Sequence, residues 1–168
     1  MNKRVLIAGF IAGIVVSLFV IPVMFKISAK QMFFKEVTSP YSFEKTVKLI
    51  ADRINAQPGW HVVNIINQEE EIIKHGGKDV GKVKIIKFCN AKLSANMLGS
   101  DDRKFMSVKM PLSISVYELS NGKVEIGLMN GYLMARMFSG TKTGDIMEKV
   151  VKDMESIMGF VHFRFSIF

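Results

Sequence analysis

Cys89 is the best single candidate for a chemically reactive residue, and it is the single cysteine among the 168 residues. It follows the predicted strand Lys82–Phe88 and precedes Asn90, which can cap a helix predicted over Ala91–Leu98. The positive end of a helix dipole favours a thiolate, which could take part in redox or persulfide chemistry or bind a soft ligand. Two alternatives remain open: a buried cysteine that packs as a small apolar residue, or a disulfide to another chain.

Methionine is the second candidate, since the chain has twelve of these residues. Soft thioethers could hold Cu(I) or a haem iron, and Met134 and Met137 are spaced to share one helix. Three further methionines precede them in sequence: Met106, Met110 and Met129. Ordinary core packing is the competing interpretation. The candidate cofactor-binding residues are therefore Cys89, Met134 and Met137, although the leading interpretation predicts no cofactor.

Other reactive arrangements are excluded by spacing. The histidines His61, His75 and His162 are too far apart in sequence for a helical or hairpin metal motif. A single cysteine excludes a disulfide within the chain and a site built from several cysteines. Residues 76–82 have the glycine and lysine spacing of a phosphate loop, but Val83 stands where that loop requires serine or threonine. We predict a flexible turn there and no nucleotide site.

An uncharged run near the start of the sequence predicts a membrane anchor. Val5–Phe25 has 21 residues without a charge, between Arg4 and Lys26. At about 1.5 Å per residue the run matches a bilayer core of roughly 30 Å, and it exceeds the roughly 7 to 15 apolar residues of a cleaved signal. We therefore predict an uncleaved transmembrane helix within an anchor and juxtamembrane segment at residues 1–30, in the cell inner membrane.

Basic residues flank this run on both sides, so the positive-inside rule does not predict the orientation of the helix in the membrane. A short segment before the helix and a long domain after it favour a domain outside the cytoplasm, in the periplasm. The net charge of +8 could also suggest nucleic acid, but the lysines are dispersed and several lie beside the anchor. We expect the lipid bilayer as a partner, and no nucleic acid.

The anchor also carries small residues at a spacing of four. Gly9, Gly13 and Ser17 lie on one helix face, where another backbone could approach closely. The alternative is that glycine is simply frequent in membrane helices. We predict that this face pairs helices, either in a homo-oligomer or with the subunits of a membrane complex.

Residues 31–158 have the length of one ordinary domain. Asn121-Gly122 between the alternating runs Ser113–Leu119 and Lys123–Met129 predicts a β-hairpin. Further strands are predicted at Gln31–Val37, Trp60–Ile66 and Lys82–Phe88. Helices are predicted from Pro40 or Phe43 to Gln57, at Gln68–Lys74 as a short helix or turn, at Ala91–Leu98, at Gly131–Ser139 and at Gly144–Met158.

The last residues, 159–168, form an aromatic tail. Apolar and polar residues alternate from Phe160 to Phe168, with Phe163 and Phe165 among the apolar ones. A free tail of this kind would act as an unpaired, aggregation-prone strand edge. We therefore expect it to pair with the sheet, a partner or the bilayer surface.

Several stretches, taken in order, resemble one family. They are residues 39–44, residues 88–92, Met110-Pro111 leading into residues 114–118, residues 121–124, and residues 129–134. Their order and spacing resemble the bacterial and archaeal family called domain of unknown function 302, over most of Phe34–Met158. The resemblance implies a compact α+β domain with a mostly antiparallel sheet packed by helices, often dimeric and without an established activity. Many members carry a second cysteine after this Met-Pro, where this chain has Leu112, which argues against chemistry with two thiols.

The leading hypothesis is therefore a non-enzymatic, membrane-anchored interaction domain that self-associates or serves as an accessory subunit of a membrane complex. The rival is a ligand or cofactor domain that binds haem, copper or a sulfur species through Cys89 and nearby methionines. An enzyme is the third and weakest option. A Cys89→Ser variant separates the first two, because only the rival predicts loss of bound cofactor.

Overall fold

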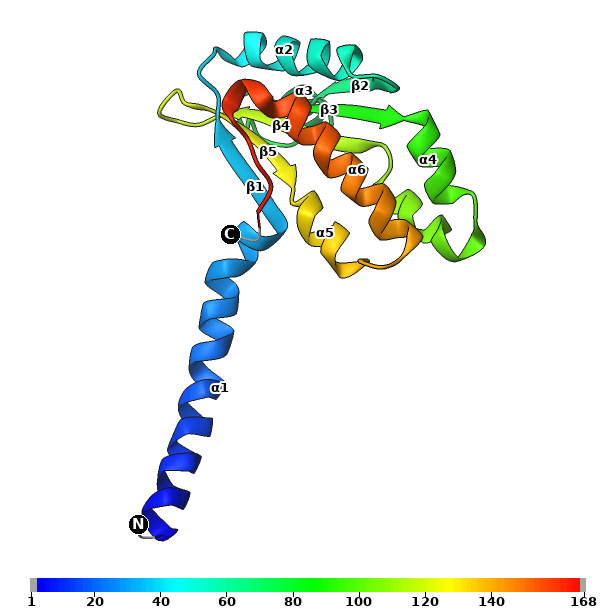
Figure 1. Cartoon of the computed structure of the whole chain (residues 1–168). Helices are drawn as coiled ribbons and strands as arrows, with labels where there is room; N and C mark the ends of the chain where they lie inside the picture. The colour runs from blue at the N-terminus through cyan, green and yellow to red at the C-terminus, as the bar shows by residue number, and fades with distance from the viewer. Residues whose placement is uncertain (1–2, 167–168) are drawn as a thin grey trace.

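The computed structural model describes residues 3–166; within the first helix it describes the side chains of residues 3, 7, 9–20, 30, 32 and 33. In chain order the elements are α1 (Lys3–Phe33), β1 (Phe34–Thr38), α2 (Phe43–Ala56), β2 (Trp60–Asn67), α3 (Gln68–Lys74), β3 (Val83–Asn90), α4 (Ala91–Leu98), the 3-10 helix η1 (Asp101–Lys109), β4 (Leu112–Glu118), β5 (Val124–Met129), α5 (Gly131–Met137), α6 (Lys142–Ile157) and the 3-10 helix η2 (Met158–Val161). In Figure 1, α1 stands away from a compact body that holds the other elements. Over the described residues, no helix is both long enough and apolar enough to cross a membrane.

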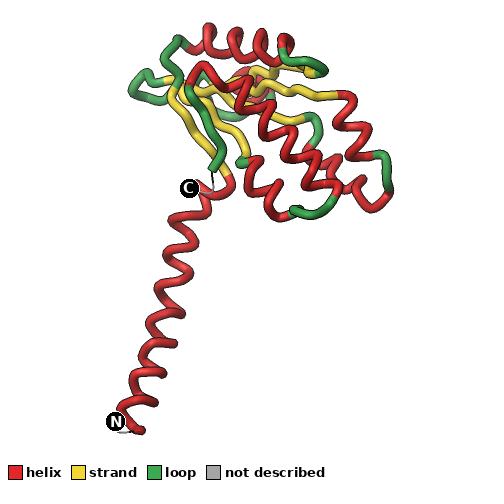
Figure 2. Tube along the Cα trace, in the orientation of Figure 1, coloured by secondary structure: helices red, strands yellow, loops and turns green. Residues whose placement is uncertain are grey.

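The body is built on one five-stranded sheet in the order β1-β5-β4-β3-β2. Each neighbouring pair of strands is antiparallel. The two edge strands β1 and β2 are consecutive in the chain, so α2 carries the chain across the sheet between them, as Figure 2 shows. The predicted α+β class with an antiparallel sheet packed by helices is confirmed.

The β4–β5 hairpin forms where the Asn-Gly pair predicted it. Glu118 pairs with Val124, and the Leu119 N–H donates to the Lys123 carbonyl at 2.8 Å. Gly122 has a φ of 79°, a conformation that glycine adopts without a steric penalty. The hairpin places β5 in the sheet with its last residue, Met129, beside the start of β1.

One face of the sheet is covered by helices and forms the core. Helix α2 turns Phe43, Val47, Ile50 and Ile54 toward the sheet at helical spacing, as predicted, and all four are buried. From the sheet, the fully buried side chains include Ile86, Phe88, Ile114, Val116 and Ile126. Helix α6 adds Val151, Met154 and Ile157 to the same cluster. Helices α2 and α6 therefore cover the same face of the sheet.

The first strand begins later than predicted, which corrects the strand at Gln31–Val37. Helix α1 continues to Phe33, and β1 covers Phe34–Thr38. Only these five residues lie opposite β5, from Met129 back to Glu125. Just before them, the Asn130 N–H donates to the Phe33 carbonyl at 2.9 Å, and the Asn130 side-chain amide donates to the Met32 carbonyl at 2.9 Å. The partner strand therefore determines where β1 starts.

The 3-10 helix η1 was not predicted from the sequence. Arg103 holds η1 against the preceding helix, because its guanidinium donates to the Met97 carbonyl at 3.2 Å and the Asn96 carbonyl at 3.4 Å. Met106 points inward and is buried, whereas Phe105 and Val108 are exposed. These two exposed residues are three positions apart, a spacing at which 3-10 side chains eclipse each other.

The aromatic tail packs into its own domain without joining the sheet as a strand. His162 has a φ of 52°, which turns the chain after η2. Phe163 and Phe165 are then buried in the main core, with their rings 4.7 Å apart in an edge-to-face arrangement. The prediction of pairing with the sheet, a partner or the bilayer is corrected for these residues; Ile167 and Phe168 lie outside the described residues.

Three side chains connect the end of α1 to the sheet. Glu36 Oε2 lies 2.5 Å from Lys30 Nζ, and the Tyr117 hydroxyl donates to Glu36 Oε1 at 2.5 Å. The hydrogen bonds from Lys30 and then from Tyr117 hold the pKa of Glu36 below its ordinary value. Burial, followed by the hydrogen bond to the Glu36 carboxylate, raises the pKa of Tyr117.

A lowered pKa at Glu36 makes this contact sensitive to acid. The stability it contributes should be present above the unfolded pKa of about 4.3, and should be lost as the pH falls through the lower folded pKa. Tyr117→Phe removes one of the two stabilising hydrogen bonds, so the pKa of Glu36 should rise in a carboxyl-carbon NMR titration. Ser113→Ala, on the same strand, is the control. An unchanged titration in Tyr117→Phe would mean that the hydroxyl contact is not formed in solution.

Candidate functional site

A cavity of about 320 Å³ lies between the sheet and the helices α4, η1, α5 and α6. Phe88, Ile114 and Leu128 line it from the sheet, and Phe165 lines it from the tail. Helix α6 contributes Met147, Val150, Val151 and Met154, which share one helix face. The cavity has the size of a small-molecule site at the lower end of the usual range of about 300 to 1,000 Å³.

Methionine is the most frequent residue type in the lining of this cavity. Seven of the twelve methionines in the chain contribute to it: Met97, Met106, Met110, Met129, Met134, Met147 and Met154. Methionine side chains are flexible and polarisable, so a wall made of them adapts its shape to an occupant. Four of the seven belong to the methionine cluster identified in the sequence, whereas Met97, Met147 and Met154 do not. The seven-residue spacing of Met147 and Met154, which places both on one helix face, was the sequence signal that could have added them to the cluster.

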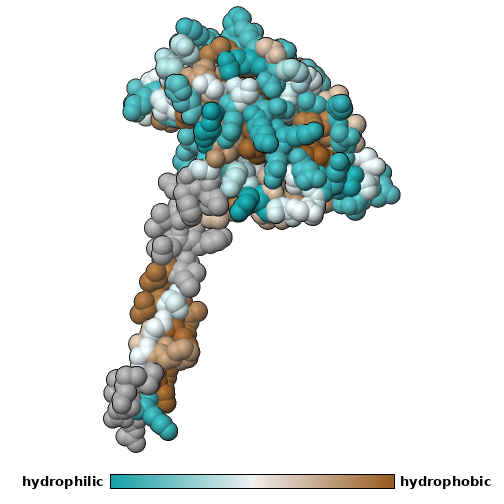
Figure 3. All heavy atoms as spheres, in the orientation of Figure 1, coloured by the Kyte–Doolittle hydropathy of each residue, from teal (hydrophilic) through white to brown (hydrophobic). Residues whose placement is uncertain are grey.

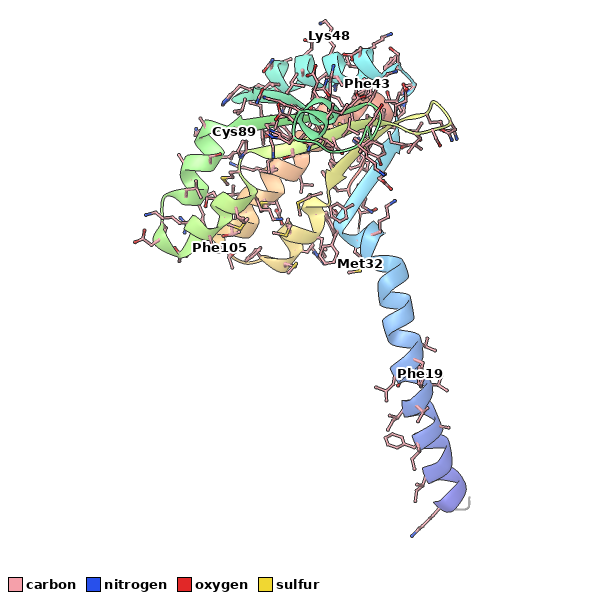
Figure 4. All side chains as sticks on the ribbon, turned by 180° about the vertical axis from the view of Figure 1, so that it is seen from behind. Phe19, Met32, Phe43, Lys48, Cys89 and Phe105 are labelled. Carbon is pink, nitrogen blue, oxygen red and sulfur yellow. The ribbon has the colours of Figure 1, made fainter. Side chains whose placement is uncertain are left out.

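Cys89 also lines the cavity, at the position predicted from the sequence. It is the penultimate residue of β3, and the Asn90 side chain caps α4 by accepting from the Leu93 N–H at 3.0 Å. The Cys89 thiol is half-buried and lies 3.1 Å from the Ser94 hydroxyl. Phe88 and Cys89 point to opposite sides of the strand, yet both line the cavity. The cavity therefore reaches around the end of β3, where Figure 4 labels Cys89 beside α4.

His61 is a neighbour of Cys89 that sequence spacing did not reveal. The β2–β3 register places His61 directly opposite Cys89, and side chains opposite each other in an antiparallel pair lie on the same face. His61 is exposed. Only the strand pairing brings these residues together, because 28 positions separate them in sequence. Cys89 lines the cavity, whereas His61 is outside the lining and lies opposite Cys89 on the neighbouring strand.

The polar groups around the cavity mostly have partners within the chain. Lys87 Nζ donates to the Ser113 hydroxyl at 2.7 Å, and Trp60 Nε1 donates to Asp153 Oδ2 at 2.8 Å. The Asn90 side chain caps α4, and the Ser94 hydroxyl forms a hydrogen bond with the Cys89 thiol. The surface left for an occupant is therefore apolar and rich in sulfur.

The structure separates the predicted pair Met134 and Met137. Met134 lines the cavity together with Cys89, whereas Met137 lies outside the lining and is 65 % exposed. Helix α5 is short, and its one buried residue among those described is Ala135. Within residues 3–166, no three histidine, cysteine, aspartate or glutamate side chains come together as a metal site. Of the candidate cofactor residues, Cys89 and Met134 therefore share one site.

The predicted helix-pairing face is exposed along α1. Gly9, Gly13 and Ser17 lie apart from the domain, and a Cβ atom added at either glycine would meet nothing within 4 Å. The Ser17 hydroxyl donates to the Ile14 carbonyl at 2.8 Å, a bond within the helix itself. The pairing of helices through this face stays a prediction.

Comparisons with known proteins agree on the domain. The family model described as "Domain of unknown function DUF302" matches residues 35–161. A solved structure, described as an uncharacterized conserved protein DUF302 from Bacillus stearothermophilus, has a similar fold with a TM-score of 0.66 and 18 % identity. The similarity covers 77 % of this chain and 98 % of that chain. A search of curated proteins found no match. The chain from β1 to η2 thus has the fold and the sequence pattern of one known family, and the protein belongs to the DUF302 family.

Proposed function

We propose that this protein is a binding domain whose cavity takes a small apolar molecule, and that α1 holds it at a membrane. The observation that carries the proposal is the cavity of about 320 Å³ with seven methionines in its wall. Burial of apolar surface drives such binding, because most polar side chains of the lining already have partners within the chain. A ring-sized or short-chain hydrocarbon is the chemical class that these walls accept.

The membrane part of the proposal rests on the sequence and on the exposure of α1. The run Val5–Phe25 has no charged residue, and α1 is helical over 31 residues. Among its described side chains, Phe10 is 70 % exposed and Phe19 is 73 % exposed. In Figure 3 these described parts of α1 are hydrophobic, while the visible face of the domain is mostly hydrophilic. A bilayer would remove the apolar side chains of α1 from water.

The interaction role predicted from the sequence belongs to the same proposal. A tethered domain of this kind would act as an accessory subunit, and the Gly9–Gly13–Ser17 face would pair α1 with a second copy or with another membrane helix. The side of the membrane on which the domain lies stays a prediction.

The cavity can be tested with methionine methyl signals in NMR. The full-length protein, labelled at its methionine methyl groups and held in a mild detergent, is titrated with toluene. The signals of the seven cavity methionines should shift, because the ring current of a bound aromatic molecule acts at short range. The signals of Met137, which is exposed, and Met158, which is buried outside the cavity lining, should stay in place.

A matched pair of variants makes this test decisive. Ser94→Leu places a larger side chain in the cavity wall and should weaken toluene binding. Ser107→Leu makes the same change at an exposed position of η1 that does not line the cavity, and should leave binding unchanged. The proposal is wrong if the cavity signals do not move, or if the two variants bind toluene equally.

A second candidate is favoured by the sulfur atoms and by the position of His61. Eight sulfur-bearing side chains line the cavity, and His61 lies opposite Cys89 in the strand register. Thiolate, thioether and imidazole are the ligands that Cu(I) prefers. Titration with Cu(I) against a chromophoric chelator tests this candidate. Cys89→Ser should abolish Cu(I) binding in this case, whereas the binding of toluene should survive the same substitution.

A further inference from the structure

Five exposed apolar side chains lie on the side of the domain from which α1 leaves. They are Phe34 at 54 % exposure, Phe105 at 56 %, Val108 at 81 %, Met129 at 38 % and Met137 at 65 %. We call these residues the membrane-proximal patch. Large apolar side chains that are exposed together on one side of a domain mark a surface that binds a partner or a lipid bilayer.

The members of the patch are connected by contacts between distant segments of the chain. Phe34 pairs with Met129 across the β1–β5 ladder. Lys109 Nζ lies 3.6 Å from Met129 Sδ, which brings the end of η1 to the end of β5. At the other end of η1, the ring of Phe105 packs 6.3 Å from the ring of Phe138, the residue that follows Met137. These contacts link the base of α1, the end of β5, η1 and the turn after α5.

Basic residues are interleaved with the patch. Residues 103–111 and 129–144, which carry four of its five members, contain three lysines and two arginines, and the exposed Asp102 and Asp145 directly flank these segments. Lys104, Lys109, Arg136 and Lys142 are all exposed. Lys104 is paired with Asp101 at 2.5 Å, just outside these segments. Apolar side chains between cationic ones complement a surface of anionic headgroups over acyl chains.

The direction of α1 decides what this patch would face. Figure 1 shows α5 on the same side of the body as the base of α1. In Figure 4, Phe105 lies at the level of Met32, near the base of α1, whereas Lys48 on α2 lies at the opposite end of the domain. If α1 enters a bilayer, the patch is held close to the surface of that bilayer, at a high effective concentration.

We propose that the membrane-proximal patch docks on an anionic lipid surface, with Phe105 and Val108 inserted among the headgroups. This inference rests on the proposed anchoring of α1 and adds a second contact between the same chain and the membrane. The contact fixes the domain against the bilayer and places η1, one wall of the cavity, at the lipid interface. An apolar molecule dissolved in the bilayer would then lie next to the cavity wall.

Three tryptophan reporters in the full chain test this docking. The protein is reconstituted into vesicles of phosphatidylglycerol and brominated phosphatidylcholine, in which bromine quenches nearby tryptophan. Val108→Trp reports on the patch, Phe19→Trp on the anchor and Lys48→Trp on the far end of the domain. The native Trp60 is buried and present in every variant, so the unsubstituted protein supplies the background.

The three reporters distinguish failure of the docking from failure of the anchor. We expect Phe19→Trp and Val108→Trp to lose most of their added emission, and Lys48→Trp to keep its own. Quenching at Phe19→Trp without quenching at Val108→Trp overturns the docking and leaves the anchor intact. No quenching at Phe19→Trp overturns the anchor, and the docking with it. Protection of Val108→Trp from aqueous acrylamide without bromine quenching means that a second copy covers the patch, which also overturns the docking.

Charge reversal supplies an independent check of the lipid chemistry. In the Val108→Trp background, Lys109→Glu combined with Arg136→Glu should abolish the bromine quenching of Val108→Trp, because both cations lie beside the patch. The matched control reverses Lys45 and Lys48 on α2, at the far end of the domain, and should change nothing. Equal quenching after both double reversals would show that anionic headgroups are not the partner.

Discussion

Replacing Phe165 with alanine should lower the free energy of unfolding by about 3 to 5 kcal/mol, as for other large-to-small changes in a core. Phe165 is 9 % exposed, contacts the ring of Phe163 edge to face and forms part of the cavity wall. Its backbone N–H donates to Glu155 Oε1 at 2.8 Å, which ties the tail to α6. Urea unfolding of the full-length protein in mild detergent, followed by the fluorescence of Trp60, measures the change.

Arg164→Ala is the matched control for this prediction, because Arg164 is exposed and lies between the two buried phenylalanines. It should change the unfolding free energy by less than about 0.5 kcal/mol, as surface substitutions usually do. Phe163→Ala and Phe165→Ala together should cost less than the sum of the two, because the rings contact each other. If Phe165→Ala unfolds at the same urea concentration as Arg164→Ala, the tail does not pack as the structure has it.

Replacing Gly144 with alanine should destabilise the protein by about 1 to 3 kcal/mol or more, as overpacking does. A Cβ atom at this position would lie 2.3 Å from the Phe138 carbonyl oxygen and 2.9 Å from its carbon. The Phe138 carbonyl is held in place, since it accepts from the Thr141 N–H at 3.1 Å and from the Thr141 hydroxyl at 2.7 Å. The clash is with backbone, so no side-chain rotation relieves it.

The sign of this effect is the decisive observation. In an unconstrained helix, alanine is more favourable than glycine by about 0.8 to 1 kcal/mol, so a free first turn of α6 would be stabilised. Lys142→Ala, at an exposed position in the same turn, is the control and should be nearly neutral. Thermal unfolding of the three proteins compares them. A Gly144→Ala variant that melts above the parent would show that the α5–α6 turn is not closed against Gly144.

Both predictions concern the walls of the cavity. Phe165 comes from the tail, and the turn at Gly144 sets α6 against α5, where Met134 and Met147 face the cavity. A loss of packing at either place should therefore also weaken the binding of toluene. The change in the methionine methyl signals then connects the stability of the fold to the proposed function.

Local patterns predicted the elements whose residues interact mainly with near neighbours. The Asn-Gly pair predicted the β4–β5 hairpin, because a short turn needs a residue such as Gly122 that adopts a positive φ without a steric penalty. The spacing of Phe43, Val47, Ile50 and Ile54 predicted α2, because a helix needs one apolar face to pack. The prediction of Asn90 as the cap of α4 is confirmed by its hydrogen bond to the Leu93 N–H.

Predictions failed where a distant segment decides the conformation. A run of apolar and β-prone residues predicted a strand from Gln31, but β1 begins only where β5 supplies a partner, at Phe34. The tail alternates like a strand, yet Phe163 and Phe165 are buried in the core and no described strand edge pairs with them. Periodicity records which side chains are apolar, and does not record which edge or cavity will receive them.

By itself, the sequence determined the family pattern, the uncharged run of α1 and the position of Cys89 before the capped helix α4. Only the tertiary structure decided that Cys89 faces His61, that Met134 joins six other methionines around one cavity, and that Met137 stays outside. The physical reason is that local propensity acts over a few residues, whereas a cavity exists only after the sheet and four helices from distant parts of the chain have packed together.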